Sequence, residues 1–174
     1  MVFPNQVAAL AEMRIGAEDD SFQQVVTIFF GALNREADWA PLIPDLNRVL
    51  DTLGGQARVQ VVYDRAFFDA LATPHKVFEP LCSYDRYQEL LRAADIGLLP
   101  LEPTRFNEHK SDLKFIECAA NGVAALASHT VYSRTIAHEE TGLIYQSPAE
   151  FGLTLERLIR DGRLRRRLVH NAHQ

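Results

Sequence analysis

The chain has 174 residues, of which 47% are hydrophobic and 24% are charged, and this composition fits one globular domain with a sizeable core. The net charge of −5 argues against nucleic acid as the main partner, and no apolar run reaches the roughly 20 residues that a membrane span requires. Two cysteines are too few for a disulfide framework and no signal peptide is visible. We therefore expect a cytoplasmic protein, with peripheral attachment at the inner face of a membrane as an alternative.

Apolar runs alternate with amphipathic stretches from residue 25 to the end of the chain. The run 25–30 is rich in β-branched and aromatic residues and ends at a glycine, as is typical of a strand buried on both faces. The stretch 39–53 repeats apolar residues at helical spacing and stops at a Gly-Gly pair. The same alternation predicts further strands at 59–63, 76–78, 96–101, 123–127 and 143–145, and helices at 66–71, 84–94, 131–137, 148–160 and 163–172.

This alternation predicts an α/β fold with a Rossmann-like parallel sheet of about six strands and helices on both of its faces. Residues 1–24 are expected to be a lead-in, and residues 25–174 the domain itself. In parallel sheets of this kind, ligands bind beyond the carboxyl ends of the strands. Three loops are expected at that edge, and they span 31–36, 101–110 and 128–133.

The stretch 106–128 is expected to form a polar loop, a helix that opens near His109, an Asn-Gly stop and a buried strand. His109, Lys110 and Lys114 crowd the expected helix start, where the helix dipole disfavours each cation by roughly 0.3–1 kcal/mol. An anion such as a phosphate, bound to the exposed backbone N–H groups, would resolve this conflict. The sequence therefore predicts an anion site at this helix start.

Four polar residues of this stretch, Lys110, Lys114, Glu117 and Asn121, fall within an arc of about 60° if all lie on one helix, because helical residues advance by about 100° each. Cations near the helix start suit a diphosphate, and a carboxylate two turns further on can accept hydrogen bonds from a vicinal diol such as ribose. The alternative is a solvent-exposed stripe in which Lys114 and Glu117 form an i, i+3 pair worth about 0.2–0.5 kcal/mol. Spacing alone leaves both interpretations open.

Sequence signatures of several other classes are absent. No Walker A sequence occurs, which argues against P-loop nucleotide hydrolysis, and no G-x-S-x-G elbow occurs, which argues against a hydrolase. The six histidines show neither H-x-x-x-H nor Cys/His ligand spacing, so we expect no metal and no cofactor. Asp64 follows a strand, as the phosphoacceptor of a receiver domain would, but Gly31-Ala32 stands where such a domain needs an acidic pair.

Several motifs point to one known family. The segment from Lys110 to Ser128 follows the pattern K-S-x-x-K-x-x-E-x-x-A-x-G-x-P-V-x-A-S, with Ala124 in place of the proline. Residues 141–145 match T-G-x-L-V, residues 164–172 match L-R-x-x-L…N-A, and residues 2–7 match V-x-P-N-G-V. In these motifs the chain resembles, over nearly its whole length, the C-terminal donor-binding domain of group 1 retaining GT-B glycosyltransferases.

The resemblance implies one half of a GT-B fold that binds a nucleotide-diphosphate sugar and needs no metal. By this resemblance, Glu117 would hold the ribose, and His109 and Glu117 would be the catalytic residues. The donor diphosphate would lie on Gly31, Arg35, Lys110, Ser111 and Lys114, and the nucleobase near Phe78, Glu79 and Pro80. Many family members carry two glutamates separated by seven residues, and here His109 stands in the first of those positions.

The resemblance also implies a partner, an N-terminal acceptor-binding domain of the same full-length protein, with residues 1–24 as the inter-domain linker. We expect the 174-residue chain alone to be inactive in glycosyl transfer, since donor and acceptor meet between two domains in this family. Two alternatives to a glycosyltransferase remain open. One is a non-catalytic module that binds a nucleotide or sugar nucleotide, and the other is a structural α/β interaction domain.

Overall fold

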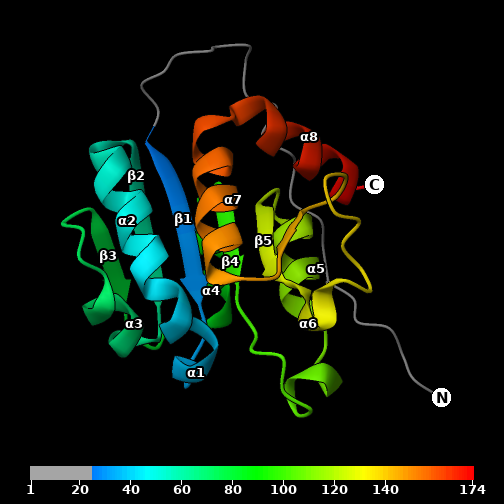
Figure 1. The fold of residues 1–174 in the computed structure, drawn as a ribbon, viewed down its shortest axis with the longest axis horizontal. Coiled ribbons are helices and arrows are strands. Elements are labelled where there is room, and N and C mark those ends of the chain that lie inside the picture. Colours follow the sequence, from blue (N-terminus) through cyan, green and yellow to red (C-terminus); the bar gives the residue numbers. More distant parts are fainter. Residues whose placement is uncertain (1–24) are drawn as a thin grey trace.

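The computed structural model describes residues 25–174, and the predicted linker at 1–24 lies outside them. The described residues form a six-stranded sheet in the order β3-β2-β1-β4-β5-β6, with all pairings parallel (Figure 1). The predicted α/β fold with a Rossmann-like parallel sheet is confirmed. The strands are β1 (Val26–Gly31), β2 (Ala57–Val62), β3 (Lys76–Glu79), β4 (Ile96–Leu99), β5 (Ala124–Ser128) and β6 (Leu143–Tyr145).

Helices cover both faces of the sheet, as the alternation of the sequence predicts. On one face α2 and α7 pack against each other, and on the other face α4 and α5 lie against β1, β4 and β5 (Figure 1). The helices are α1 (Glu36–Trp39), α2 (Ile43–Leu53), α3 (Arg65–Ala70), α4 (Tyr84–Arg92), α5 (Leu113–Ala120), α6 (His129–Tyr132), α7 (Pro148–Arg160) and α8 (Gly162–Ala172). Short 3₁₀ turns add η1 (Ala40–Leu42), η2 (Gly54–Gln56) and η3 (Asn107–His109).

The central strand β1 shows why its sequence is apolar without alternation. Ile28 and Phe30 belong to the core cluster beneath α2 and α7, whereas Phe29 belongs to the cluster on the α4 and α5 side. All six residues of β1 are buried. A strand covered by helices on both faces buries side chains in both directions, which is why the run reads as continuously hydrophobic.

Two predicted helices differ from the observed ones. The helix expected to open near His109 begins only at Leu113, because residues 107–109 form η3 and Lys110 is extended, with φ −72° and ψ 162°. The helix expected at 131–137 is the single turn α6, which starts at His129 directly after β5. The prediction that three cations crowd a helix start is therefore wrong for His109 and Lys110, and Lys114 alone lies in the first turn of α5.

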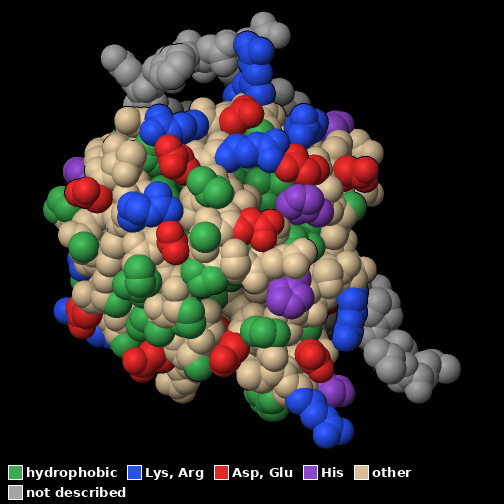
Figure 2. Space-filling view, viewed as in Figure 1, with side chains coloured by type: hydrophobic (Ala, Val, Ile, Leu, Met, Phe, Trp, Pro, Cys, Tyr) green, Lys and Arg blue, Asp and Glu red, His purple; other side chains and the backbone are tan. Residues whose placement is uncertain are grey.

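The surface over α2 and α7 mixes acidic and basic side chains (Figure 2). Ion pairs within these helices include Arg48–Asp45 on α2 and Arg160–Glu156 on α7. The face therefore carries no continuous field of one sign. Among the helices of residues 25–174, none combines the length and the apolar character that crossing a bilayer demands.

Candidate functional site

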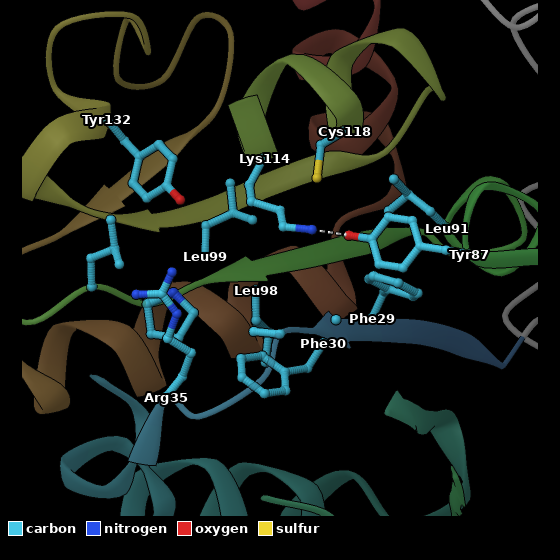
Figure 3. Close-up of a pocket in the computed structure, with 14 residues that line it drawn as sticks. Phe29, Phe30, Arg35, Tyr87, Leu91, Leu98, Leu99, Lys114, Cys118 and Tyr132 are labelled. Atoms are coloured by element: carbon cyan, nitrogen blue, oxygen red, sulfur yellow. Dashed lines mark hydrogen bonds between the residues drawn. The ribbon is translucent and has the colours of Figure 1, made fainter. Parts of the chain in front are cut away.

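The strand order places β1 beside β4, and a hollow opens between these strands at their carboxyl ends (Figure 3). Strands β2 and β3 extend the sheet from β1 in one direction, whereas β5 and β6 extend it from β4 in the other, so this is the topological switch point. Most of the lining is apolar, and Arg35, Lys114, Tyr87 and Tyr132 bring polar atoms to it. Its volume of about 50 Å³ has room for a few water molecules or one small anionic group, so a larger ligand would extend over the open rim.

Glu117 lies one turn beyond Lys114 on α5 and is only 4% exposed. Its Oε1 accepts a hydrogen bond from the Tyr84 hydroxyl at 3.2 Å, and its Oε2 lies 3.3 Å from Lys114 Nζ. The Lys114 contact is an ion pair without hydrogen-bond geometry, and Oε2 has no hydrogen-bond partner within the described residues. A buried carboxylate oxygen without a hydrogen-bond partner costs free energy unless another group donates a hydrogen bond to it. The alternative of a solvent-exposed Lys114–Glu117 stripe is therefore wrong for Glu117.

Lys114 is held by an aromatic cluster formed by Tyr63, Tyr84 and Tyr87. Its Nζ donates to the Tyr87 hydroxyl at 2.6 Å and lies 4.3 Å from the centre of that ring (Figure 3). Tyr87 stacks between Tyr63 and Tyr84, with ring centres 6.0 and 6.3 Å away. Burial, and then the negative charge of Glu117, raise the pKa of Tyr87, so the phenol stays protonated and neutral. The cluster therefore fixes one cation and one carboxylate next to the hollow.

Gly31 and Arg35 form the β1 side of the hollow. A Cβ atom at Gly31 would lie 2.6 Å from atoms of both the Phe29 and the Tyr87 rings, so any larger residue would displace the ring that holds Lys114. Arg35 lies in the β1–α1 connection, and its Nη1 donates to Asp38 Oδ2 at 3.2 Å. The hollow thus has a cation on each side, Arg35 from the β1–α1 connection and Lys114 from α5 (Figure 3).

The other predicted residues of the β4–α5 segment lie outside the hollow. Lys110 Nζ lies 4.9 Å from the centre of the Phe106 ring, and neither Lys110 nor the exposed Ser111 lines the hollow. His109 is exposed, and its Nδ1 lies 2.7 Å from the carbonyl oxygen of Arg105. These three side chains, which we call the rim, lie outside the hollow, whereas Lys114 lines it and the buried Glu117 adjoins Lys114.

The predicted nucleobase segment lies at the end of β3. Phe78 is half-buried and packs against Phe68 with ring centres 5.5 Å apart. The Glu79 carbonyl accepts a hydrogen bond from the Tyr63 backbone N–H at 3.0 Å, and the Glu79 carboxylate pairs with Arg86 at 3.4 Å. Pro80 is exposed beside them. The segment is therefore connected through Tyr63 to the aromatic cluster, in which the Tyr84 hydroxyl donates to Glu117.

The start of α5 differs from the starts of α4 and α7. Ser83 and Ser147 cap those two helices by accepting a hydrogen bond from a backbone N–H, but Asp112 makes no such bond at the start of α5. The Asp112 carboxylate instead accepts from the Thr135 hydroxyl at 2.5 Å. The first turn of α5 contains no acidic residue. The backbone N–H groups of this first turn therefore receive no side-chain cap from Asp112.

Three functional candidates were missed by reasoning from the sequence, namely Asp38, Tyr84 and Tyr87. The contact between Tyr84 and Glu117 joins residues 33 positions apart, and the contact between Tyr87 and Lys114 joins residues 27 positions apart. The signal that could have found the two tyrosines is their i, i+3 spacing at the start of a helix that follows the predicted nucleobase segment. Asp38 has no sequence signal of comparable strength.

No group of three or more His, Cys, Asp or Glu side chains in residues 25–174 is arranged to hold a metal ion. Cys118 is buried at the hollow, and burial raises the pKa of its thiol to about 12. A thiol with such a pKa remains protonated at neutral pH and is a poor metal ligand and nucleophile. The reactive features of the hollow are therefore its two cations and the adjoining carboxylate.

Comparison with known proteins gives a family and a fold. The family described as glycosyl transferase-like matches residues 44–174. No curated protein sequence matches the chain. Among solved structures, the C-terminal domain of a glycosyl transferase group 1 family protein (LpcC) from Francisella tularensis is similar with a TM-score of 0.68 and 18% identity. That comparison covers 86% of this chain and 83% of the other.

Two longer proteins share the fold. WaaG, a glycosyltransferase involved in lipopolysaccharide biosynthesis, is 21% identical with a TM-score of 0.67 over 87% of this chain. HepE (Alr3699) from Anabaena, solved in complex with UDP-glucose, is 15% identical with a TM-score of 0.64 over 87% of this chain. The chain covers only 42% of WaaG and 43% of HepE. It therefore belongs to the glycosyl transferase-like family and has the fold of the C-terminal domain of group 1 GT-B glycosyltransferases.

Proposed function

We propose that this chain is the donor-binding half of a glycosyltransferase and binds the nucleoside diphosphate part of a nucleotide sugar at the hollow between β1 and β4. The observation that carries this proposal is that Arg35 and Lys114 line the hollow at the topological switch point and that the buried Glu117 lies 3.3 Å from Lys114. A diphosphate needs cations, and a ribose diol needs a hydrogen-bond acceptor. This site supplies both within one turn of α5.

The diphosphate is proposed to lie between Arg35 and Lys114, close to the start of α5. These groups would stabilise the negative charge that develops on a departing diphosphate, so the reaction proposed here is metal-independent. Lys110 and Ser111, at the rim, would contact the distal phosphate only from outside the hollow. The ribose would hydrogen-bond to Glu117, whose Oε2 has no such partner in the described residues. The nucleobase would lie toward 78–80.

Transfer is proposed to require an N-terminal domain that holds the acceptor, as the family's two-domain architecture implies. His109 is exposed, and we propose that its ring faces the sugar and that second domain. We propose transfer with retention of configuration, in the cytoplasm, and no activity of this chain by itself. Turnover of a nucleotide sugar by the 174-residue chain alone would contradict the last point.

Calorimetric titration tests the binding proposal. UDP, GDP, dTDP, CDP and ADP are titrated separately into the wild-type chain, into Glu117→Gln and into Glu156→Gln, the last being a control on α7. We expect one nucleotide to bind the wild type and the control equally, and Glu117→Gln to raise its dissociation constant at least about tenfold, since the amide is a poorer partner for a diol and for Lys114. The proposal would be overturned if none of the five nucleotides binds, or if Glu117→Gln binds a nucleotide as tightly as the wild type does.

A further inference from the structure

Asp38, on the single turn α1, joins two loops that border the hollow. Its Oδ2 accepts a hydrogen bond from Arg35 Nη1 at 3.2 Å, and its Oδ1 accepts from the backbone N–H of Glu102 and from Asn107 Nδ2, both at 2.8 Å. The Asp38 side chain is only 6% exposed. One shielded carboxylate thus connects the β1–α1 segment with the β4–α5 loop, across the switch point.

Asn107 completes the connection on the β4–α5 side. It is 5% exposed, and its Nδ2 also donates to the Glu102 carbonyl at 2.9 Å, while its backbone N–H donates to the Thr104 hydroxyl at 3.1 Å. These bonds fold residues 102–107 into a compact turn immediately before His109 and Lys110. The conformation of the loop that borders the site therefore depends on an acceptor supplied by α1.

The next residue along the chain, Trp39, anchors Asp38 to the core. Trp39 is 4% exposed, and its Nε1 donates to the buried Asp64 carboxylate at 3.1 Å. Asp64 in turn caps α3 by accepting from the Phe67 backbone N–H at 3.0 Å. Because Trp39 is fixed in the core, the adjacent Asp38 is held on a rigid support beside Arg35, which lines the hollow.

We propose that Asp38 is a positioning residue of the donor site: it fixes the Arg35 guanidinium at the hollow and locks the β4–α5 loop to the same support. This inference rests on the proposed function. Arg35 has five N–H donors, and the contact with Asp38 engages Nη1, which leaves other donors for a phosphate. Holding the side chain before the ligand arrives reduces the conformational entropy that binding would cost.

Two variants separate the contact of Asp38 with Arg35 from its contact with the β4–α5 loop. Asp38→Asn retains an oxygen that accepts from Glu102 and Asn107 but replaces the acceptor for Arg35 with an NH₂ group, so Arg35 is released. Asn107→Ala removes the side-chain link to the loop and leaves the Arg35–Asp38 pair in place. Glu36→Gln is the matched control, because it removes the same charge from an exposed position on the same helical turn.

Two measurements are made on each protein. NMR relaxation of the Arg35 side-chain Nε–H reports its order without ligand, and calorimetry compares a nucleoside diphosphate with its parent nucleoside. We expect Arg35 to be ordered in the wild type, in Asn107→Ala and in Glu36→Gln, and mobile in Asp38→Asn. We also expect Asp38→Asn to weaken diphosphate binding about tenfold while nucleoside affinity stays unchanged.

Arg35 that is already mobile in the wild type would overturn the inference, even if Asp38→Asn does not fold. Diphosphate binding by Asp38→Asn that equals or exceeds that of the wild type would overturn it as well, as would an equal loss in Glu36→Gln. If no nucleoside diphosphate binds the wild type, the proposed function is wrong. The order of Arg35 in the same ligand-free samples still tests whether Asp38 positions that side chain.

Discussion

The segment from His109 to the end of α5 divides into two regions with different surroundings. His109, Lys110 and Ser111 lie at the rim, with His109 and Ser111 exposed and Lys110 over the Phe106 ring. Lys114 and Glu117, only a few residues later, are held by Tyr84 and Tyr87 at the hollow. Both regions carry cations and both match the family motif, so charge and motif alone do not separate them.

Fixed contacts separate these two regions, because Tyr87 and Tyr84 hold Lys114 and the buried Glu117, whereas His109 and Ser111 are exposed. The Lys114 ammonium and the Glu117 carboxylate are held in place before any ligand arrives, and less water screens the charge of the buried Glu117. Side chains at the rim are screened by solvent and lose conformational entropy when they bind. We therefore expect the α5 region to determine affinity for the donor, and the rim to act only once the acceptor and the second domain are present.

The largest expected effect is the difference between two matched lysine variants. Lys114→Met should raise the dissociation constant of the nucleoside diphosphate about tenfold or more, because it removes a cation from the hollow and the partner of Glu117. Lys110→Met removes the same charge at the rim and should change that constant by less than about twofold. Calorimetric titration of both variants measures the difference, and equal losses would show that the two regions do not differ.

Gly31→Ala tests how strongly the aromatic cluster depends on packing. The added Cβ would meet the Phe29 and Tyr87 rings at 2.6 Å, so we expect a loss of about 1–3 kcal/mol in the free energy of unfolding. Chemical denaturation measures this quantity. Gly55→Ala is the control, because its added Cβ would meet its nearest neighbour, His75, only at 3.7 Å. If Gly31→Ala and the wild type had equal free energies of unfolding, the aromatic cluster would accommodate the added Cβ without loss of stability.

Raising the pH into the alkaline range should lower the free energy of unfolding through groups that are buried in the folded chain. Burial raises the pKa of Cys118 from 9.0 to about 12, and it also raises the pKa values of Tyr87, Tyr132 and Tyr145 above their usual 10.0. The unfolded chain then releases these protons at a lower pH than the folded chain does. Stability from these groups is fully present below pH 9 and declines as the pH rises from there, by about 1.4 kcal/mol per pH unit for each group that titrates only when unfolded. Urea unfolding from pH 8 to 11 measures the decline, and a constant free energy would contradict the burial of these groups.

The smallest effect is expected for His109→Ala. Its ring is exposed, so its removal should change the free energy of unfolding by less than about 0.5 kcal/mol and the nucleoside diphosphate affinity by less than about twofold. Its contribution should show only in glycosyl transfer by a protein that includes the acceptor domain. A large loss of nucleotide affinity in this chain would place His109 in the donor site itself.

The fold was predictable because the alternation of apolar runs and helical patterns extends through residues 25–174. All six strands lie within two residues of their predicted bounds. The helix start at 109 was wrong, since η3 and the extended Lys110 depend on Asn107, whose side chain bonds to Asp38 across 69 positions of the sequence. Long-range hydrogen bonds of this kind leave no periodic signal in the sequence.

The candidate site was predictable only in part. Glu117, Lys114 and Arg35 were identified from spacing and from the family motif, but separating them from Lys110 and Ser111 required the contacts of each side chain, such as the hydrogen bond from Lys114 to Tyr87. The aromatic cluster was missed because Tyr84 and Tyr87 lie in a stretch whose apolar spacing is that of an ordinary amphipathic helix. Gly31 was assigned to the diphosphate by resemblance, whereas the structure adds a packing reason that involves the Tyr87 ring.

The most direct test of the central proposal is a crystal structure of this chain with the nucleoside diphosphate that binds it most tightly. We expect the phosphates to lie within hydrogen-bond distance of Arg35 and Lys114, and a ribose hydroxyl to donate to Glu117. Phosphates bound at Lys110 and Ser111, with Lys114 still bonded to Tyr87 and Glu117 untouched, would contradict the proposal.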